Sequence, residues 1–148
     1  MKRDFKHRLT LLSRSNSKEG YIKLSLDHIH LRCEDYEASI DFFKKMFGSV
    51  EVLRFEVGGW PVVKISLGDT FLSLSPKKPD VTIKCPASEP HWGIYHIAFV
   101  VESLADTVAE LKAKGGKFAV EFAPMPNGYN AAFFIAVDGL QIEFLEKV

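Results

Sequence analysis

An internal repeat divides this sequence into two similar halves. The stretch from Asp27 to Gly48 (DHIHLRCEDYEASIDFFKKMFG) aligns without a gap with the stretch from Tyr95 to Gly116 (YHIAFVVESLADTVAELKAKGG). A repeat of this kind indicates two copies of one supersecondary unit, so it restricts the possible folds more than any single motif does. Each copy has histidine as its second residue, at His28 and His96. Two histidines in equivalent places predict one site to which both halves contribute.

The first copy begins with an alternating pattern. Polar and apolar residues alternate over 24–32, which predicts a strand with His28 and His30 on one face and Ile29 and Leu31 on the other. Apolar residues at helical spacing follow in both copies, and a glycine ends each helical stretch. Each copy is therefore expected to form a strand followed by an amphipathic helix.

Three further strands follow each copy of the repeat. Short runs of β-forming residues, separated by glycine-containing turn signals, predict strands at about 50–57, 60–67, 70–75, 117–123, 130–137 and 140–146. Each half then has the order βαβββ, and its helix must cover one apolar face of the sheet. The predicted fold class is α+β: two βαβββ modules that form a curved eight-stranded mixed sheet of two half-barrels, with the helices outside.

The predicted domain organisation follows from this repeat. Residues 23–148 form a single domain, with modules at 24–75 and 94–147 joined by a proline-rich linker over 76–93. Residues 1–22 are more basic than the rest and form an N-terminal arm, either a loose segment or short helix, or a lid or dimer arm.

Composition narrows the classes of partner. Of 148 residues, 47% are hydrophobic, which is enough for a packed core. Nineteen basic residues balance nineteen acidic ones, so no electrostatic reason exists to expect nucleic acid or an anionic membrane. No apolar run approaches the roughly 20 residues of a membrane span. The two cysteines lack metal or redox spacing, which favours a reducing, cytoplasmic location.

Four positions on the face opposite the helix are equivalent in the two halves. They are His28 and His96 on the opening strands, and Ser73 and Glu143 on the closing strands. Two imidazoles and one carboxylate suit a divalent Fe, Mn, Zn, Ni or Co ion, whereas serine is a poor ligand and would leave positions for water and substrate. Taken singly, each residue also fits a structural histidine or a surface glutamate.

Further residues are expected to line the same cavity. His30 lies two residues after His28 and is a candidate catalytic acid or base, or else a polar core residue. Trp60, Lys64 and Phe134, together with Ser73, are predicted to line the substrate pocket. Lys64 is either a partner for a substrate anion or a solvated residue at the rim.

The repeat and its motifs resemble those of one known superfamily. The DHIHL and YHIAF openings, the DGLQIEFLE ending and the βαβββ order resemble the vicinal oxygen chelate superfamily over about residues 24–147. That superfamily includes glyoxalase I, extradiol dioxygenases and bleomycin resistance proteins. The resemblance implies that His28, His96 and Glu143 are the metal ligands. It also implies a homodimer, with a metal site built either within one chain or between two.

Departures from the family pattern restrict the expected activity. Ser73 stands where glyoxalase I has a glutamate ligand, and Phe133 and Phe134 stand where extradiol dioxygenases have a tyrosine. We expect a divalent-metal-dependent enzyme acting on a small oxygen-chelating substrate, with lyase, isomerase or ring-cleaving dioxygenase chemistry. The alternative is a non-enzymatic protein that binds or sequesters a small molecule, as bleomycin resistance proteins do.

Overall fold

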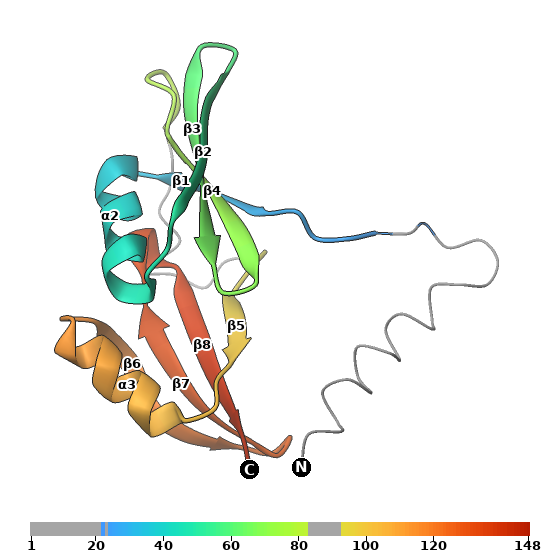
Figure 1. Cartoon of the computed structure of the whole chain (residues 1–148), viewed down its shortest axis with the longest axis vertical. Helices are drawn as coiled ribbons and strands as arrows, with labels where there is room; N and C mark the ends of the chain where they lie inside the picture. The colour runs from blue at the N-terminus through green and yellow to red at the C-terminus, as the bar shows by residue number, and fades with distance from the viewer. Residues whose placement is uncertain (1–21, 23, 83–92) are drawn as a thin grey trace.

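The chain forms two modules of the same design. The computed structural model describes residues 22, 24–82 and 93–148, so most of the predicted arm and part of the predicted linker lie outside the described residues. The elements follow the predicted order (Figure 1): β1 (Ile29–Cys33), α2 (Tyr36–Phe47), β2 (Glu51–Val57), β3 (Trp60–Leu67), β4 (Thr70–Pro76), β5 (His96–Val100), α3 (Leu104–Ala113), β6 (Lys117–Met125), β7 (Tyr129–Ile135), the 3-10 turn η2 (Val137–Gly139) and β8 (Gln141–Lys147).

Each module contributes one four-stranded mixed sheet. The strand orders are β1-β4-β3-β2 and β5-β8-β7-β6, with the first and last strand of each module parallel and the other neighbours antiparallel. The predicted α+β class and module order are confirmed. One boundary was wrong: β1 begins at Ile29 rather than at 24, and His28 precedes the strand.

Local signals in the sequence fix the helices. The Asp35 side chain accepts a hydrogen bond from the Ala38 N–H at 3.0 Å and caps α2, and Ser103 caps α3 by accepting from the Asp106 N–H at 3.2 Å. Gly48 ends α2 in the left-handed conformation, with φ of 65°. Each helix therefore begins at a side-chain cap, and α2 ends at the glycine that the sequence predicted.

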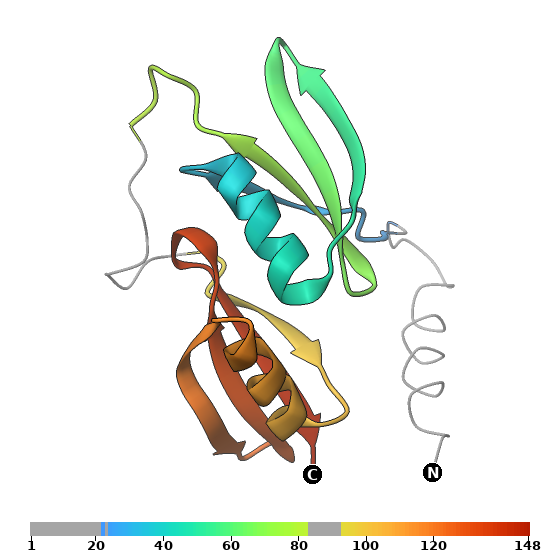
Figure 2. The same cartoon turned by 60° about the vertical axis from the view of Figure 1, so that its left-hand side comes forward.

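The core lies between the helices and one face of each sheet. Both helices lie on the same side of the molecule (Figure 2), and α2 packs Ile40 and Phe43 into a core that contains Leu72 and Leu74 of β4. The core is continuous between the modules, because the ring of Phe47 lies 5.5 Å from that of Phe134. The two modules of one chain are thus joined through their helix-covered sides.

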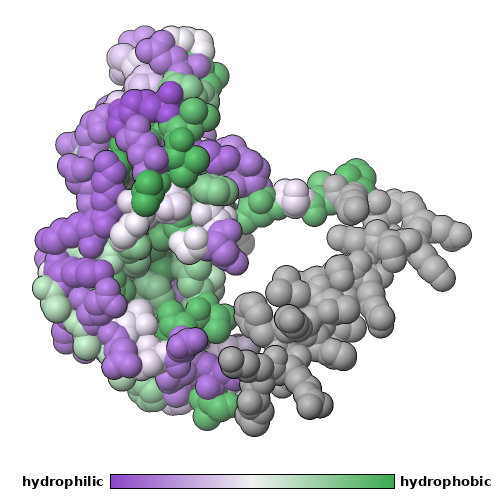
Figure 3. All heavy atoms as spheres, viewed as in Figure 1, coloured by the Kyte–Doolittle hydropathy of each residue, from purple (hydrophilic) through white to green (hydrophobic). Residues whose placement is uncertain are grey.

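The opposite faces of the two sheets remain open. Several apolar side chains on these faces are exposed, including Leu53 (53%), Val57 (60%) and Val100 (60%). Figure 3 shows hydrophobic residues gathered around a hollow near the middle of the molecule. Contiguous apolar surface of this kind marks a ligand-binding or protein-binding face. No helix among the described residues is long and apolar enough to cross a membrane.

Candidate functional site

The open face of the second module carries a histidine–glutamate pair. β5 and β8 are parallel neighbours, and Ala98 of β5 lies opposite Glu143 of β8. His96 lies two residues before Ala98 on β5, so its side chain points to the same face of the sheet as Glu143. The Nε2 atom of His96 lies 3.1 Å from Oε2 of Glu143. Glu143 is only 7% exposed, and a carboxylate this buried needs a charged or hydrogen-bonding partner. The ring of Phe133, which lies opposite Glu143 on β7, packs edge-on against His96 at 5.9 Å.

This pair has the spacing of two neighbouring ligands of one metal ion. Ligand atoms that each lie about 2.0–2.1 Å from a metal are separated by roughly 2.8 Å in octahedral geometry and by up to about 3.4 Å in tetrahedral geometry. The separation of 3.1 Å between Nε2 and Oε2 matches that range. The Nδ1 atom of His96 is buried and has no hydrogen-bond partner among the described residues. The donor set of the second module therefore fits half of a metal site.

The first module presents its own histidines on the corresponding face. His28 directly precedes β1, and its Nδ1 lies 2.5 Å from Oδ1 of Asp27. The same carboxylate oxygen lies 2.8 Å from Nζ of Lys64 on β3. This lysine, predicted to face the pocket, therefore has Asp27 as a partner and is not simply a solvated rim residue.

His30 is anchored to the last strand of the first module. Its Nε2 lies 2.9 Å from Oγ of Ser75, and its backbone lies opposite Ser73 on β4. Burial lowers the pKa of His30, and the neighbouring His28 and Arg32 lower it further. Ser73 is buried beside it, so β4 presents two hydroxyls and no carboxylate to the open face.

The three predicted ligands do not form one cluster within a single chain. Among the described residues, no three His, Cys, Asp or Glu side chains lie close enough together to hold a metal ion. His96 and Glu143 meet on the second module, while His28 stays with Asp27 on the first. The assignment of these three residues as metal ligands remains a prediction. Within one chain, the predicted ligands lie in two separate places, one on each module.

The predicted pocket residues divide between the two faces. Trp60 lies on the open side and donates its indole N–H to the carbonyl of Pro76 at 3.0 Å. Phe134 was wrongly placed in the pocket: it is 0% exposed and packs in the core against Phe47 and Phe118. The reason is strand parity, since Phe133 lies opposite Glu143 and Phe134 points to the other face.

Comparison with known proteins identifies the superfamily. A family model for the glyoxalase/bleomycin resistance protein/dioxygenase superfamily matches residues 25–144. The chain belongs to this superfamily. Its described fold agrees with that of a glyoxalase family protein from Bacillus cereus, with a TM-score of 0.70, 19% identity and coverage of 89% of this chain and 99% of that one.

Two relatives match over most of their length. A lactoylglutathione lyase of Escherichia coli O157:H7 is 28% identical over 134 residues, covering 84% of this chain and 93% of the relative. The uncharacterized protein YwkD of Bacillus subtilis (strain 168) is 31% identical over 133 residues, covering 83% of this chain and 97% of the relative.

Proposed function

We propose that this superfamily member is a divalent-metal-dependent enzyme acting on a small substrate that chelates through oxygen. The observation that carries the proposal is the pairing of His96 and Glu143 at 3.1 Å, with a nearly buried carboxylate on an otherwise open sheet face. Imidazole and carboxylate are both ligands that divalent Fe, Mn, Zn, Ni and Co accept, so a buried carboxylate beside an imidazole suits metal binding.

The site is completed by a second copy of the chain, whose His28 joins His96 and Glu143. Three observations support this arrangement. The described residues of one chain hold no three-ligand group. The modules of one chain are joined through the core beneath α2, which leaves both open faces uncovered. Those faces expose apolar side chains such as Leu53 and Val100, whose burial against a second copy is favourable.

The chemistry expected of this site is proton transfer next to a carbonyl. When bound, the metal supplies a Lewis acid that stabilises the developing oxyanion of the substrate. His30 takes up and returns the proton, and Ser75 holds its ring through the 2.9 Å contact. Ser73 offers no carboxylate, so another residue must act as the base. Two titratable residues, His30 and Lys64, lie opposite Ser73, and Lys64 is paired with Asp27, which leaves His30 as the candidate. The similarity to a lactoylglutathione lyase favours this lyase or isomerase class.

Metal analysis of the purified full-length chain tests the proposal. We expect about one Zn, Ni, Co, Mn or Fe ion per His96–Glu143 pair, and loss of the metal in His96→Ala and Glu143→Gln. Glu121→Gln is the matched control, because Glu121 is exposed on β6 and its ion pair among the described residues is with Lys112. A folded wild-type protein that takes up none of these metals would exclude the enzyme and favour a binding or sequestering protein.

Substrate assays then separate the enzyme classes. We expect solvent proton exchange at carbons next to a carbonyl in α-hydroxy ketone or thioester substrates, and a loss of more than about tenfold in His30→Gln. Oxygen consumption with catechols, in the absence of such exchange, would instead assign the site to ring-cleaving dioxygenation.

A further inference from the structure

A carboxylate stands directly beside the first-module histidine. Asp27 Oδ1 lies within hydrogen-bond distance of His28 Nδ1 at 2.5 Å and of Lys64 Nζ at 2.8 Å. Asp27 lies ahead of β1, in a segment that pairs with no strand in the part of the chain that the structure describes. The contact with Lys64 of β3 therefore connects this segment to the sheet in place of strand pairing.

The bond to Asp27 determines which ring nitrogen of His28 carries the proton. The Asp27 carboxylate contacts both the Lys64 ammonium and the His28 ring, and an ionised carboxylate can only accept hydrogen bonds. A neutral His28 ring must then carry its proton on Nδ1 to donate to Asp27. Its Nε2 is left with a free lone pair, which is the form a metal ligand needs.

Lys64 holds this carboxylate in place. Its backbone on β3 lies opposite Ser73 of β4, and its Nζ lies 4.9 Å from the centre of the Phe71 ring. The lysine side chain is only 20% exposed, so its position is set by the sheet rather than by solvent. Because the Lys64 side chain is held in place, its hydrogen bond to Asp27 orients the Asp27 carboxylate, although the Asp27 side chain itself is exposed.

The second module has no such support. The repeat places Tyr95 at the position of Asp27, and the Nδ1 of His96 has no partner among the described residues. Orientation of His96 comes instead from Glu143, through its Nε2. The carboxylate beside His28 is therefore a property of this chain's first module and not of the βαβββ repeat as such.

We propose that Asp27, held by Lys64, is a positioning residue that keeps His28 protonated on Nδ1 and so presents Nε2 as the metal-binding atom. The metal-binding part of this inference rests on the proposed function, whereas the tautomer can be measured without metal. Carboxylates in this role usually change metal affinity by about 10- to 100-fold when they are removed.

Nitrogen NMR of the metal-free, full-length chain tests the tautomer directly. In ¹⁵N-histidine-labelled protein above pH 8, we expect the His28 ring, assigned with His28→Gln, to carry its proton on Nδ1. Asp27→Ala should shift most of the population to the Nε2–H form, and Lys64→Met should leave a mixture. Asp41→Asn removes the same charge from the exposed face of α2 and should change nothing. An Nε2–H ring in the wild type, or an unchanged ring in Asp27→Ala, would overturn the proposal.

Zinc titration by calorimetry tests the consequence for binding. Asp27→Ala should weaken binding by about tenfold or more, Asp27→Asn should recover part of the loss because its carbonyl still accepts the Nδ1 proton, and Asp41→Asn should stay within about twofold. Equal affinity in the wild type and Asp27→Ala would overturn the positioning role. A wild type that binds no metal would overturn the proposed function, while the NMR result would still decide the tautomer.

Discussion

Phe133 and Phe134 show how one position along a strand separates the site from the core. Phe134 is 0% exposed and packs against Phe42, Phe118 and Phe144, whereas Phe133 lies against His96 on the open face. Alternation along β7 sends neighbouring side chains to opposite faces, so the two rings have unrelated roles despite their identical chemistry.

Truncating the two phenylalanines should therefore have different effects. Phe134→Ala leaves a cavity in the core and should lower the free energy of unfolding by about 3–5 kcal/mol, measured by urea denaturation. Phe133→Ala should cost clearly less stability while weakening metal or substrate binding, because this ring packs on His96. Equal losses of stability in both variants would contradict the assignment of faces.

Sequence reasoning was accurate where two signals agreed. His96 and Glu143 were predicted to share a face from repeat position and parity together, and their atoms meet at 3.1 Å. Phe134 was assigned from alternation across a long strand alone, where a shift of one residue reverses the face. The hydrogen bonds of His30 with Ser75 and of Asp27 with Lys64 could not be predicted, because they depend on the register between strands.

At the level of elements, the two equivalent repeat positions Gly48 and Gly116 require glycine for different reasons; at the end of α3 the left-handed conformation is taken by Gly115 instead, with φ of 88°. Gly48 has φ of 65°, and a Cβ added there would meet nothing within 4 Å. Gly116 does not adopt a positive φ, but a Cβ added there would lie 2.6 Å from the Phe134 ring and 2.8 Å from the Leu111 carbonyl oxygen. Gly48 is needed for its conformation and Gly116 for space between α3 and its sheet.

Substitution of these glycines distinguishes the two reasons. Gly116→Ala overpacks the junction of α3 and β6 and should cost about 1–3 kcal/mol of stability. Gly48→Asn should cost less, because asparagine tolerates the left-handed conformation and space is free. Thermal unfolding of both variants checks this order, and a Gly116→Ala variant as stable as the wild type would contradict the steric reason.

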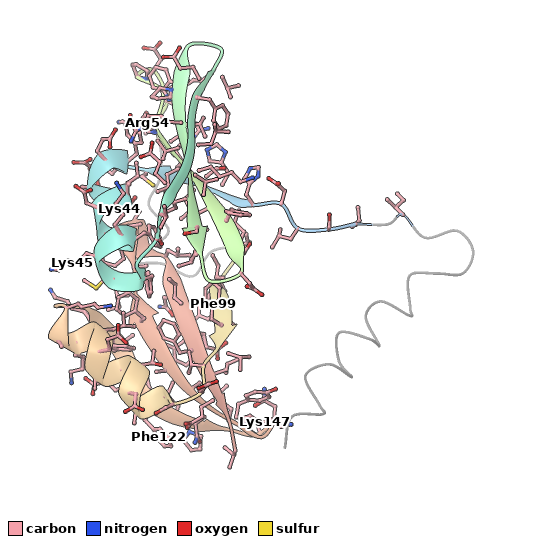
Figure 4. The ribbon with its side chains drawn as sticks, viewed as in Figure 1. Lys44, Lys45, Arg54, Phe99, Phe122 and Lys147 are labelled. Atoms are coloured by element: carbon pink, nitrogen blue, oxygen red, sulfur yellow. The ribbon has the colours of Figure 1, made fainter. Side chains whose placement is uncertain are left out.

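Arg54 joins α2 to β2 and should make stability depend on pH. Its side chain is labelled in Figure 4. The guanidinium donates to Glu37 at 2.7 Å and to Glu51 at 3.0 Å, and these bonds lower the pKa of both carboxyls. A lowered folded pKa adds stability above the ordinary glutamate pKa of 4.5, and that contribution is lost as pH falls through the lowered value.

Replacing this arginine removes the effect. Arg54→Met should be slightly less stable than the wild type at pH 7, by a small amount because the pairs are exposed. The difference should shrink as the pH is lowered below about 4 and also in 1 M salt. Urea denaturation across this pH range measures it, and a difference that grows toward low pH would have the wrong sign.

For the whole molecule, the contact between modules determines where the site can form. Phe47 of α2 packs on Phe134 of β7. Gly68 in the β3–β4 turn lies next to Phe99 of β5, which is labelled in Figure 4. The repeat predicted two equivalent modules, but it contains no information about how they contact one another. That is why the sequence left open whether one chain or two would enclose the site.

Mixing two inactive variants decides whether the site lies between chains. His28→Ala damages only the first module, and His96→Ala only the second, so each protein alone should lose tight metal binding. If each site joins His28 of one chain to His96 and Glu143 of the other, a heterodimer of the two variants has two different sites. One site lacks both histidines, and the other site retains all three ligands. Co-expressed variants carrying different affinity tags, purified through both, should then bind one metal per heterodimer. A site within one chain predicts no recovery, because every chain would carry one damaged half.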